Sequence, residues 1–264
     1  MSRLAIIAGR GALPAALVAA LPQAPVICAL DGFAPEGLAV DLVFRVERLA
    51  LFLRKLEDLG VTEVIFAGAV QRPRLDPALF DPQTAQMVPR LMAAMAAGDD
   101  ATLREVIAIF EDFGFAVVGV ETIARDLLPS AAVLAGQITA QDEADAARAA
   151  SIVAALGAVD VGQGAVVAQG LCLGVETLGG TDAMLAVVAG LPQALRPKGG
   201  LFYKAAKPAQ DRRIDLPTLG PTTVDAVAAA GLSGLCFQAG SVICLDLPEM
   251  QAHAVQHGLL LWAR

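Results

Sequence analysis

Short apolar runs that end at glycine turns and lead into helices limit the possible folds of this chain more than any other feature of its sequence. Residues 4–8 form the first such run, which ends at Gly9-Arg10-Gly11. The segment that follows, residues 13–21, is rich in Ala and Leu, as is typical of a helix. Similar strand-like runs return at residues 25–30, 42–46, 61–70 and 115–120. Helical patterns lie between them, at residues 48–59, 77–97 and 101–113. This alternation predicts an α/β fold whose first domain, over residues 1–130, is a Rossmann-like parallel sheet with helices on both faces.

The second half has a different order of elements, because strand-like runs follow one another before a helix begins. Residues 164–172 and 173–177 suit a hairpin, followed by a helix at 181–189. Further strands are expected at residues 201–205, 234–238, 241–245 and 259–262, and helices at residues 141–156, 222–230 and 247–257. The proline-marked stretch 128–136 is interpreted as a linker. We therefore predict a C-terminal mixed α/β domain over residues 137–264.

Charge limits the classes of partner. The 264 residues carry 19 basic and 27 acidic side chains, so the net charge of -8 repels nucleic acid and anionic membrane. An anionic ligand then needs a local basic patch. Six of the basic residues fall within eighteen positions, opposed only by Asp211: Arg196, Lys198, Lys204, Lys207, Arg212 and Arg213. They either bind such a ligand or belong to a solvated surface loop.

The cysteines and the lack of a long apolar segment predict a cytoplasmic protein. Four cysteines lie in apolar runs without CxxC spacing: Cys28, Cys172, Cys236 and Cys244. Such cysteines are expected to be small buried hydrophobes in a reducing compartment, not disulfides or zinc ligands. The first 25 residues loosely imitate a signal peptide, but Arg10 and two glycines interrupt the apolar stretch. No uninterrupted run reaches the roughly 18 to 20 apolar residues needed to span a bilayer.

Candidate binding residues in the first domain follow the ends of predicted strands, where an open parallel sheet binds its ligands. Gly9 and Gly11 leave backbone amides free to meet an anion, although the third glycine of the dinucleotide fingerprint is absent. Asp31 follows the second strand and is placed to meet a ribose. Gln71 and Arg72 follow a later buried strand and can bind phosphate or sugar hydroxyls. Each residue also has a structural interpretation, as a tight turn, a strand cap or a solvent-facing side chain.

Two predicted helix starts carry further candidates. Asp99 and Asp100 follow Gly98 and either cap the helix at 101–113 or bind a metal ion or sugar. Thr181 follows a glycine loop, so it can cap its helix while the loop amides cradle an anion.

The segment at residues 202–225 holds the richest mixture of charged and hydroxyl side chains. Its lysines and arginines can neutralise a diphosphate, while Asp211, Asp215 and Asp225 can hold a magnesium ion or orient water. Thr222 and Thr223 precede Asp225 at the start of a predicted helix, so their hydroxyls can face the phosphates. The structural alternative is a capped helix with an aspartate in its first turn.

His253 and His257 stand four residues apart on a predicted helix. That spacing suits two zinc ligands, but the glutamate of the HExxH pattern is absent. We interpret both histidines as surface residues.

Five segments together resemble one family along nearly the whole chain: GRGALP, FAGAVQRP, GDDATLR, ETLGGTDAM and KAAKPAQDRRIDLPTLGPTTVD. The family is the UDP-2,3-diacylglucosamine pyrophosphatases of some Gram-negative bacteria, distinct from the calcineurin-like phosphoesterases that catalyse the same step. The resemblance implies metal-dependent cleavage of UDP-2,3-diacylglucosamine to UMP and 2,3-diacylglucosamine 1-phosphate (lipid X) in lipid A biosynthesis, with Mg²⁺ or another divalent cation. It also implies a ligand site between the two domains and at most peripheral contact with the cytoplasmic face of the inner membrane.

The resemblance assigns roles to individual residues. Asp225, in the PTTVD segment, matches the family's essential acidic residue and is expected to bind the metal or position the attacking water. The next candidates for phosphate or metal contact are Lys204, Lys207, Gln210, Asp211 and Arg213, with Asp211 as a second metal ligand. Thr181 and Asp182 are expected to contact the nucleotide or sugar.

Two other functions stay open at this point. A nucleotide-dependent oxidoreductase is compatible with the Rossmann-like first half, although the glycine fingerprint is incomplete. A non-catalytic lipid or nucleotide-sugar binding module could use the same loops and would leave its ligand intact in the presence of magnesium. A homo-oligomer is a further option, and no nucleic-acid partner is expected.

Overall fold

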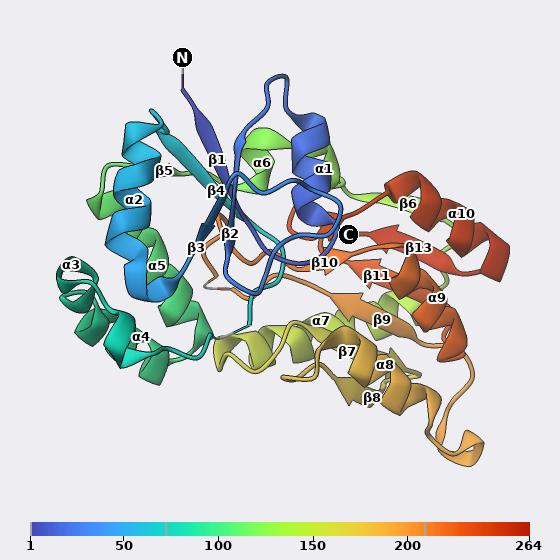
Figure 1. Ribbon diagram of the computed structural model, residues 1–264. Coiled ribbons are helices and arrows are strands. Elements are labelled where there is room, and N and C mark those ends of the chain that lie inside the picture. The colour runs from blue at the N-terminus through green and yellow to red at the C-terminus, as the bar shows by residue number, and fades with distance from the viewer. Residues whose placement is uncertain (1, 72, 209) are drawn as a thin grey trace. The chain divides into compact units, whose positions relative to one another are not determined.

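The computed structural model describes residues 2–71, 73–208 and 210–264, and the chain forms two compact units (Figure 1). The first unit comprises Met1–Arg125 together with Asp211–Asp215, and the second comprises Asp126–Gln210 together with Leu216–Arg264. The chain therefore passes from one unit to the other three times. Both units are α/β, as predicted.

A five-stranded parallel sheet forms the centre of the first unit, in the order β3-β2-β1-β4-β5. Its strands are β1 (Leu4–Ala8), β2 (Val26–Leu30), β3 (Leu42–Phe44), β4 (Glu63–Ala67) and β5 (Ala116–Val117). The strand order reverses between β1 and β4, because β2 and β3 extend the sheet on one side of β1 and β4 and β5 extend it on the other. This doubly wound order is that of a Rossmann-like unit and confirms the predicted fold class.

Helices cover both faces of this sheet (Figure 1). Alternate strand residues such as Ile7 and Val64 pack against α2 (Leu49–Asp58) and α5 (Asp99–Asp112) in one buried core. The opposite face carries α1 (Leu13–Ala20) and α6 (Val120–Ile123). The remaining helical elements near this sheet are η1 (Val46–Arg48), η2 (Pro77–Leu79), α3 (Pro82–Ala85) and α4 (Val88–Ala97).

The single helical stretch predicted at residues 77–97 is divided into η2, α3 and α4. The Asp81 carboxylate accepts hydrogen bonds from the backbone amides of Gln83 and Thr84, each at 3.0 Å, and so caps a new helix there. The prediction was wrong because the Asp81 cap, with Pro82 at the first helical position, starts a new helix inside the predicted stretch.

The second unit is built on a six-stranded mixed sheet in the order β6-β13-β11-β9-β7-β8. Its central strands β9, β11 and β13 are parallel, whereas β6 and β7 run antiparallel to their neighbours. The strands are β6 (Ala132–Ala135), β7 (Gly164–Ala168), β8 (Leu171–Val175), β9 (Leu201–Lys204), β11 (Gly234–Phe237) and β13 (Leu260–Ala263). The predicted hairpin is therefore β7–β8, and the predicted mixed α/β architecture is confirmed.

One face of the second sheet packs on α7 (Ala140–Ala158), through residues such as Val167 and Tyr203. The other face, with Phe202 and Leu235, packs on α8 (Gly180–Ala189), α9 (Pro221–Ala229) and α10 (Leu247–His257). A small parallel pair, β10 (Thr218–Leu219) and β12 (Ile243–Cys244), and the turns η3 (Arg125–Leu127) and η4 (Gln193–Leu195) complete the structure. None of the helices in the described parts of the chain is long and apolar enough to cross a membrane.

The stretch at residues 128–136, which we interpreted as a linker, contains a strand of the second sheet. β6 pairs antiparallel with β13, and the Gln251 side chain donates a hydrogen bond to the Leu134 carbonyl at 3.0 Å. Edge pairing with a distant strand cannot be read from the local proline and glycine pattern.

A second departure concerns the segment Asp211–Asp215, which lies within the predicted C-terminal domain but packs with the first unit. Ile214 belongs to the buried core that α2 and α5 cover. Arg212 forms an ion pair with Glu121 at 3.3 Å, and Arg213 forms one with Glu111 at 2.6 Å. An apolar anchor and two charge pairs therefore fasten this segment to the first unit.

All four cysteines are free, and three of them are buried as predicted. Burial raises the pKa of the Cys28, Cys236 and Cys244 thiols to about 12 in each case. Cys172 is exposed, so its predicted burial was wrong: it lies near the start of β8, the edge strand of its sheet, where the first two residues are exposed.

Candidate functional site

The exits of β1 and β4 run side by side at the carboxyl edge of the first sheet. Gly9 donates from its amide to the Ala67 carbonyl at 2.7 Å, and Arg10 exchanges two backbone hydrogen bonds of 2.9 Å with Ala69. A Cβ atom on Gly9 would lie 2.6 Å from the Ala69 carbonyl oxygen, so only glycine fits there. Gly11 is exposed with φ +97°, a backbone conformation that glycine adopts readily. These contacts explain why glycines form this tight turn. Anion binding by the amides of the turn stays a prediction.

Gln71 is exposed just beyond β4, at the same edge as the Gly9 turn. Arg72 lies outside the described residues. Because the strand order reverses between β1 and β4, this edge is the position at which open α/β sheets bind ligands.

Asp99 and Asp100 occupy the first turn of α5, where acidic side chains interact favourably with the helix dipole. Gly98 occupies the N-cap, so neither aspartate stands at the capping position itself. Asp100 is paired with Arg104 one turn later.

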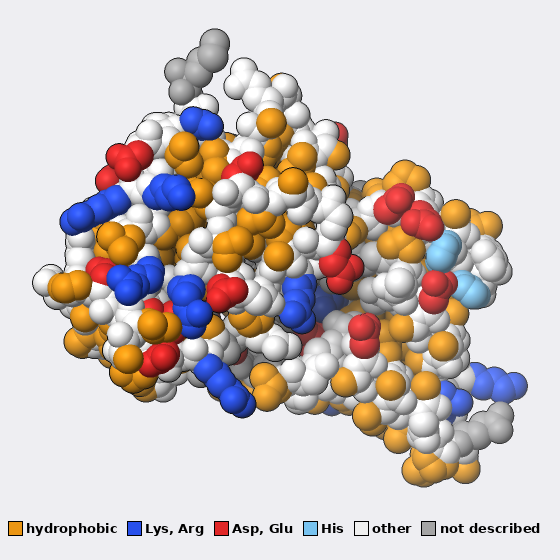
Figure 2. Space-filling view, in the orientation of Figure 1, with side chains coloured by type: hydrophobic (Ala, Val, Ile, Leu, Met, Phe, Trp, Pro, Cys, Tyr) orange, Lys and Arg blue, Asp and Glu red, His pale blue; other side chains and the backbone are white. Residues whose placement is uncertain are grey.

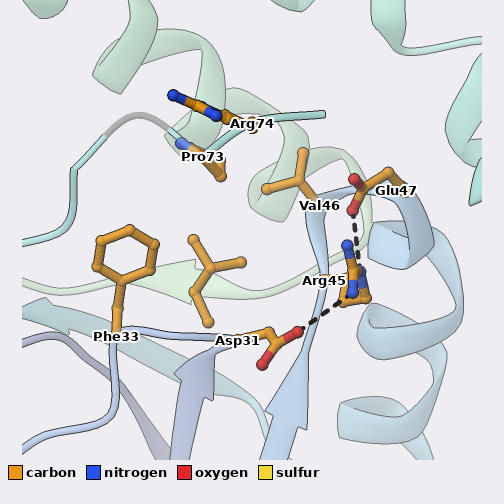
Figure 3. Close-up of a pocket in the computed structure, with 8 residues that line it drawn as sticks. Asp31, Phe33, Arg45, Val46, Glu47, Pro73 and Arg74 are labelled. Atoms are coloured by element: carbon orange, nitrogen blue, oxygen red, sulfur yellow. Dashed lines mark hydrogen bonds and ion pairs between the residues drawn. The ribbon is translucent and has the colours of Figure 1, made fainter. Parts of the chain in front are cut away.

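A cavity of about 250 Å³ opens over the carboxyl ends of β2 and β3 and the segment after β4 (Figure 3). It is lined by Leu30, Asp31, Phe33, Arg45, Val46, Glu47, Pro73 and Arg74. Arg45 lies between two carboxylates, 3.2 Å from Asp31 Oδ2 and 3.5 Å from Glu47 Oε2. Glu47 is 2% exposed and also accepts a hydrogen bond of 2.9 Å from the Asp76 amide. Sequence reasoning missed Glu47, whose partners lie on a different segment.

Burial raises the pKa of the Glu47 carboxyl, but hydrogen bonds from the Asp76 amide, its own amide and Arg45 outweigh burial and hold the pKa below its usual range. The carboxylate therefore stabilises the first unit fully above the unfolded-state pKa of about 4.3, and this contribution is lost as the pH falls through the lower folded-state pKa.

Glu47→Gln is expected to lower the free energy of unfolding by about 1–3 kcal/mol at pH 7, the range for disrupting a buried hydrogen-bonded group. The difference from wild type should shrink at pH 3.5, where protonation begins to remove the same charge from the wild type. Urea unfolding followed by far-UV circular dichroism measures both values, with Glu57→Gln on the exposed face of α2 as the control. A difference that stays constant with pH would contradict the stabilising role of the charge.

A buried polar network lies at the carboxyl edge of the second sheet. Lys204 ends β9, Glu176 follows β8 and Thr181 lies in the first turn of α8. Both charged residues are less than 10% exposed. The Lys204 ammonium is 3.2 Å from Glu176 Oε2 and donates to the Thr181 hydroxyl at 2.6 Å. That hydroxyl in turn donates to Glu176 Oε2 at 2.8 Å. Two predicted binding residues, Lys204 and Thr181, are thus brought together by Glu176.

Gly164 on β7 makes room for this network. It lies between Lys204 and Glu176 in the sheet, since it pairs with Lys204 and its carbonyl accepts from the Glu176 amide at 2.8 Å. A Cβ atom at this position would lie 2.6 Å from Glu176 Oε2 and 2.8 Å from the Phe202 ring. The two ions meet because the strand between them has no side chain there.

Asp225 on α9 is held by two histidines of α10. His253 Nδ1 lies 2.9 Å and His257 Nε2 lies 3.0 Å from the same oxygen, Asp225 Oδ1. Within the described chain, no hydrogen bond reaches Oδ2. The histidines are partly exposed, and Figure 2 shows them in pale blue beside acidic side chains. Their interpretation as plain surface residues missed this contact, although the four-residue spacing places both on one helix face.

Burial raises the pKa of the Asp225 carboxyl, but hydrogen bonds from His257 and His253 and their charge outweigh burial and hold the pKa below its usual range. The side chain is therefore a carboxylate near neutral pH, with one oxygen fixed and the other open.

The remaining candidates of the segment at residues 202–225 have separate partners. Lys207 forms an ion pair with Asp160 at 2.5 Å, and its amide donates to the Gln210 side chain at 3.1 Å. Thr222 is exposed at the start of α9, and the Thr223 hydroxyl accepts from the Gly220 amide at 3.4 Å.

Asp211 and Arg213 form a bidentate pair in the first unit. Arg213 Nε lies 3.0 Å from Asp211 Oδ1, and a terminal nitrogen lies 2.7 Å from Oδ2. The Arg213 hydrogen bonds hold the pKa of the Asp211 carboxyl below its usual range. The role of Asp211 as a metal ligand stays a prediction. To bind a metal ion, its carboxylate would have to release the Arg213 guanidinium.

A metal ion is held in a protein either by side chains alone or by side chains together with a substrate. In the described parts of the chain, no group of three or more His, Cys, Asp or Glu side chains is arranged to hold an ion. Mg²⁺ is commonly bound by one or two carboxylates together with substrate phosphates. Asp225, with its open oxygen, fits that mode.

Two family models match the chain. The LpxI N-terminal domain matches residues 3–127, and the LpxI C-terminal domain matches residues 129–262. A relative from Caulobacter vibrioides, named UDP-2,3-diacylglucosamine pyrophosphatase LpxI, is 36% identical over 275 residues, which cover 99% of this chain and 97% of the relative. The similarity thus extends over both units.

Proposed function

The chain belongs to the LpxI family, and we propose that it is a pyrophosphatase that hydrolyses UDP-2,3-diacylglucosamine to UMP and 2,3-diacylglucosamine 1-phosphate in lipid A synthesis. The observation that carries this proposal is the 36% identity to the Caulobacter pyrophosphatase over 99% of the chain. A relative that matches both units supports the same reaction more strongly than one that shares a single domain.

Hydrolysis of a diphosphate requires water that loses a proton as it attacks phosphorus, and a leaving phosphate whose charge is neutralised. Asp225 suits the first task, because it is a partly exposed carboxylate with Oδ1 fixed by His253 and His257. Oδ2 is then free either to accept a proton from water or to hold a metal ion.

Lys204 suits the second task. Its ammonium has three N–H groups, of which one is directed to Glu176 and one to Thr181. A phosphate oxygen can take the third without breaking the buried pair. Helix α8 begins at the same place, so its first amides also favour an anion.

We further propose a requirement for Mg²⁺, with Asp225 as its protein ligand together with phosphate oxygens of the substrate. When bound, the ion would neutralise developing charge on the phosphates. We place the protein in the cytoplasm, with at most peripheral contact with the inner membrane, where its amphiphilic substrate lies.

The test is release of UMP from UDP-2,3-diacylglucosamine by the purified full chain, with Mg²⁺ and with EDTA. We expect hydrolysis that stops in EDTA and returns when Mg²⁺ is added in excess. If hydrolysis continues in EDTA, the metal requirement falls and the pyrophosphatase proposal stands. If the substrate binds with Mg²⁺ present but stays intact, the chain is a binding module instead.

A further inference from the structure

We propose that one surface of the first unit, formed by strand β3 and helix α2, binds the surface of an anionic membrane. This β3–α2 surface presents four exposed side chains, Val43, Arg48, Leu51 and Lys55. The two cations contact lipid headgroups, and the two aliphatic side chains enter the apolar layer beneath them. The inference rests on the proposed function for one point, that the substrate is an amphiphile that lies in a membrane.

A groove of about 340 Å³ between β3 and α2 gives this surface an apolar base. The rings of Phe44 on β3 and Phe52 on α2 line the groove and stack on each other, with centroids 4.0 Å apart and an interplanar angle of 9°. Val43 and Leu51 line the same groove and are 64% and 48% exposed. Because β3 is the edge strand of its sheet, no further strand of the unit covers them. Exposed aliphatic side chains on an aromatic base form a patch that favours an apolar partner.

The cations of this surface lie on one face of α2. Arg48 is the N-cap of the helix and Lys55 lies in its last turn, so they are seven residues or about 10 Å apart along the axis, with Leu51 between them. Figure 2 shows Lys and Arg side chains over α2 with hydrophobic side chains beside them. Positive charge and apolar surface therefore alternate over a short distance.

Both cations keep their charge available. Within the described chain, neither the Arg48 nor the Lys55 side chain forms an ion pair or a hydrogen bond. Arg48 acts on the buried Asp81 through its field and not through an ion pair. Asp41, which also lines the groove, is occupied, because its Oδ2 accepts a hydrogen bond of 2.8 Å from the Ile27 amide.

The basic run that the sequence singled out differs from this surface. Four of its members have carboxylate partners in the folded chain: Lys204, Lys207, Arg212 and Arg213. The net charge of -8 repels an anionic surface, so approach to one requires cations that the protein itself does not neutralise. Arg48 and Lys55 meet that requirement.

The composition of the β3–α2 surface fits a membrane better than a second copy or a nucleic acid. Docking of a second copy about a two-fold axis would bring the cations of both copies into one interface, where like charges repel. Nucleic acid offers phosphates to Arg48 and Lys55 but leaves Val43 and Leu51 without an apolar partner. An anionic bilayer offers phosphates at its surface and hydrocarbon just below, so it satisfies both kinds of side chain.

Co-sedimentation of the full chain with lipid vesicles tests the inference. The wild type should bind vesicles of equal parts phosphatidylcholine and phosphatidylglycerol, and should bind vesicles of phosphatidylcholine alone much more weakly. Arg48→Gln/Lys55→Gln should weaken binding to the mixed vesicles about thirtyfold, since each basic side chain near an anionic surface contributes roughly fivefold. Val43→Ser/Leu51→Ser should weaken it about tenfold, because less apolar surface is buried. High salt should weaken wild-type binding as well, a measurement that needs no variant.

Arg148→Gln/Lys198→Gln is the matched control, because it removes the same charge from exposed positions of the second unit. It should bind the mixed vesicles as the wild type does. All the substituted side chains are exposed, so each variant should keep the wild-type far-UV circular dichroism spectrum. For an active enzyme, Arg48→Gln/Lys55→Gln should release UMP at the wild-type rate from detergent-dispersed substrate and more slowly from substrate held in the mixed vesicles.

The outcomes separate this inference from the proposed reaction. Equal binding of the wild type to both kinds of vesicle, or unchanged binding by Arg48→Gln/Lys55→Gln, would overturn the membrane surface even if UDP-2,3-diacylglucosamine is hydrolysed. Loss of binding in the control pair alone would place the membrane contact on the second unit and would also overturn it. If Val43→Ser/Leu51→Ser changes only the oligomeric state of the vesicle-free protein, the surface holds a second copy instead. Binding that depends on Arg48 and Lys55 supports the inference even if no hydrolysis occurs.

Discussion

Asp225→Ala is expected to lower kcat for UDP-2,3-diacylglucosamine hydrolysis by about 10²- to 10⁴-fold, the range for loss of a general acid or base. The reason is that this carboxylate has one oxygen held by His253 and His257 and one oxygen open to water or metal. Release of UMP under saturating substrate measures the change. Because Asp225 is partly exposed, the thermal unfolding midpoint should move little.

Two comparisons make this prediction sharper. His253→Asn and His257→Gln retain donors near the original Nδ1 and Nε2 positions, so each should lose less activity than the corresponding alanine variant. Gln256→Ala, exposed on the same helix α10, should behave as wild type. Full activity in the His253→Ala/His257→Ala double variant would show that the histidine contacts do not orient Asp225, and full activity in Asp225→Ala would remove it from the reaction.

Lys204→Met is expected to destabilise the second unit by about 3–5 kcal/mol, because it leaves the Glu176 charge buried without its partner. Trp262 is the only tryptophan of the chain and lies on β13, so its fluorescence follows unfolding of this unit in urea. Adding Glu176→Leu should recover most of the loss, since replacing both ions by apolar groups is often near neutral.

Lys198→Met is the matched control for the lysine substitution. Lys198 is exposed, and its replacement should change the free energy of unfolding by no more than about 0.5 kcal/mol. A Lys204→Met variant as stable as wild type would mean that the Lys204–Glu176 pair contributes nothing to the stability of the second unit. A Lys204→Met/Glu176→Leu variant no more stable than Lys204→Met would show that packing at these positions, and not the unpaired charge, determines the loss of stability.

Local patterns in the sequence predicted the architecture because parallel strands and covering helices have recognisable periods and turns. The run at residues 4–8 followed by Gly9 is β1 and its turn, and the helix predicted at 247–257 has the bounds of α10. The linker prediction was wrong because β6 is defined by its pairing with β13, which lies at the other end of the chain.

The candidate site was predictable in its residue types and not in their partners. Lys204 and Lys207 were interpreted as parts of one basic patch, but Glu176 and Asp160 neutralise them from 28 and 47 positions away. The histidine partners of Asp225 lie 28 and 32 positions further along the chain. Charge counted along a sequence includes only neighbours, whereas the field at a site depends on every folded neighbour.

The segment Asp211–Asp215 has a consequence for synthesis on the ribosome. The first unit contains residues up to Arg125, but its buried core also includes Ile214, which is translated about 90 residues later. At a translation rate of roughly 5–20 residues per second, Ile214 is synthesised on the order of 4–18 seconds after Arg125. Until then the apolar position that Ile214 will fill is open, and nascent chains of this protein are expected to need chaperone protection during that interval.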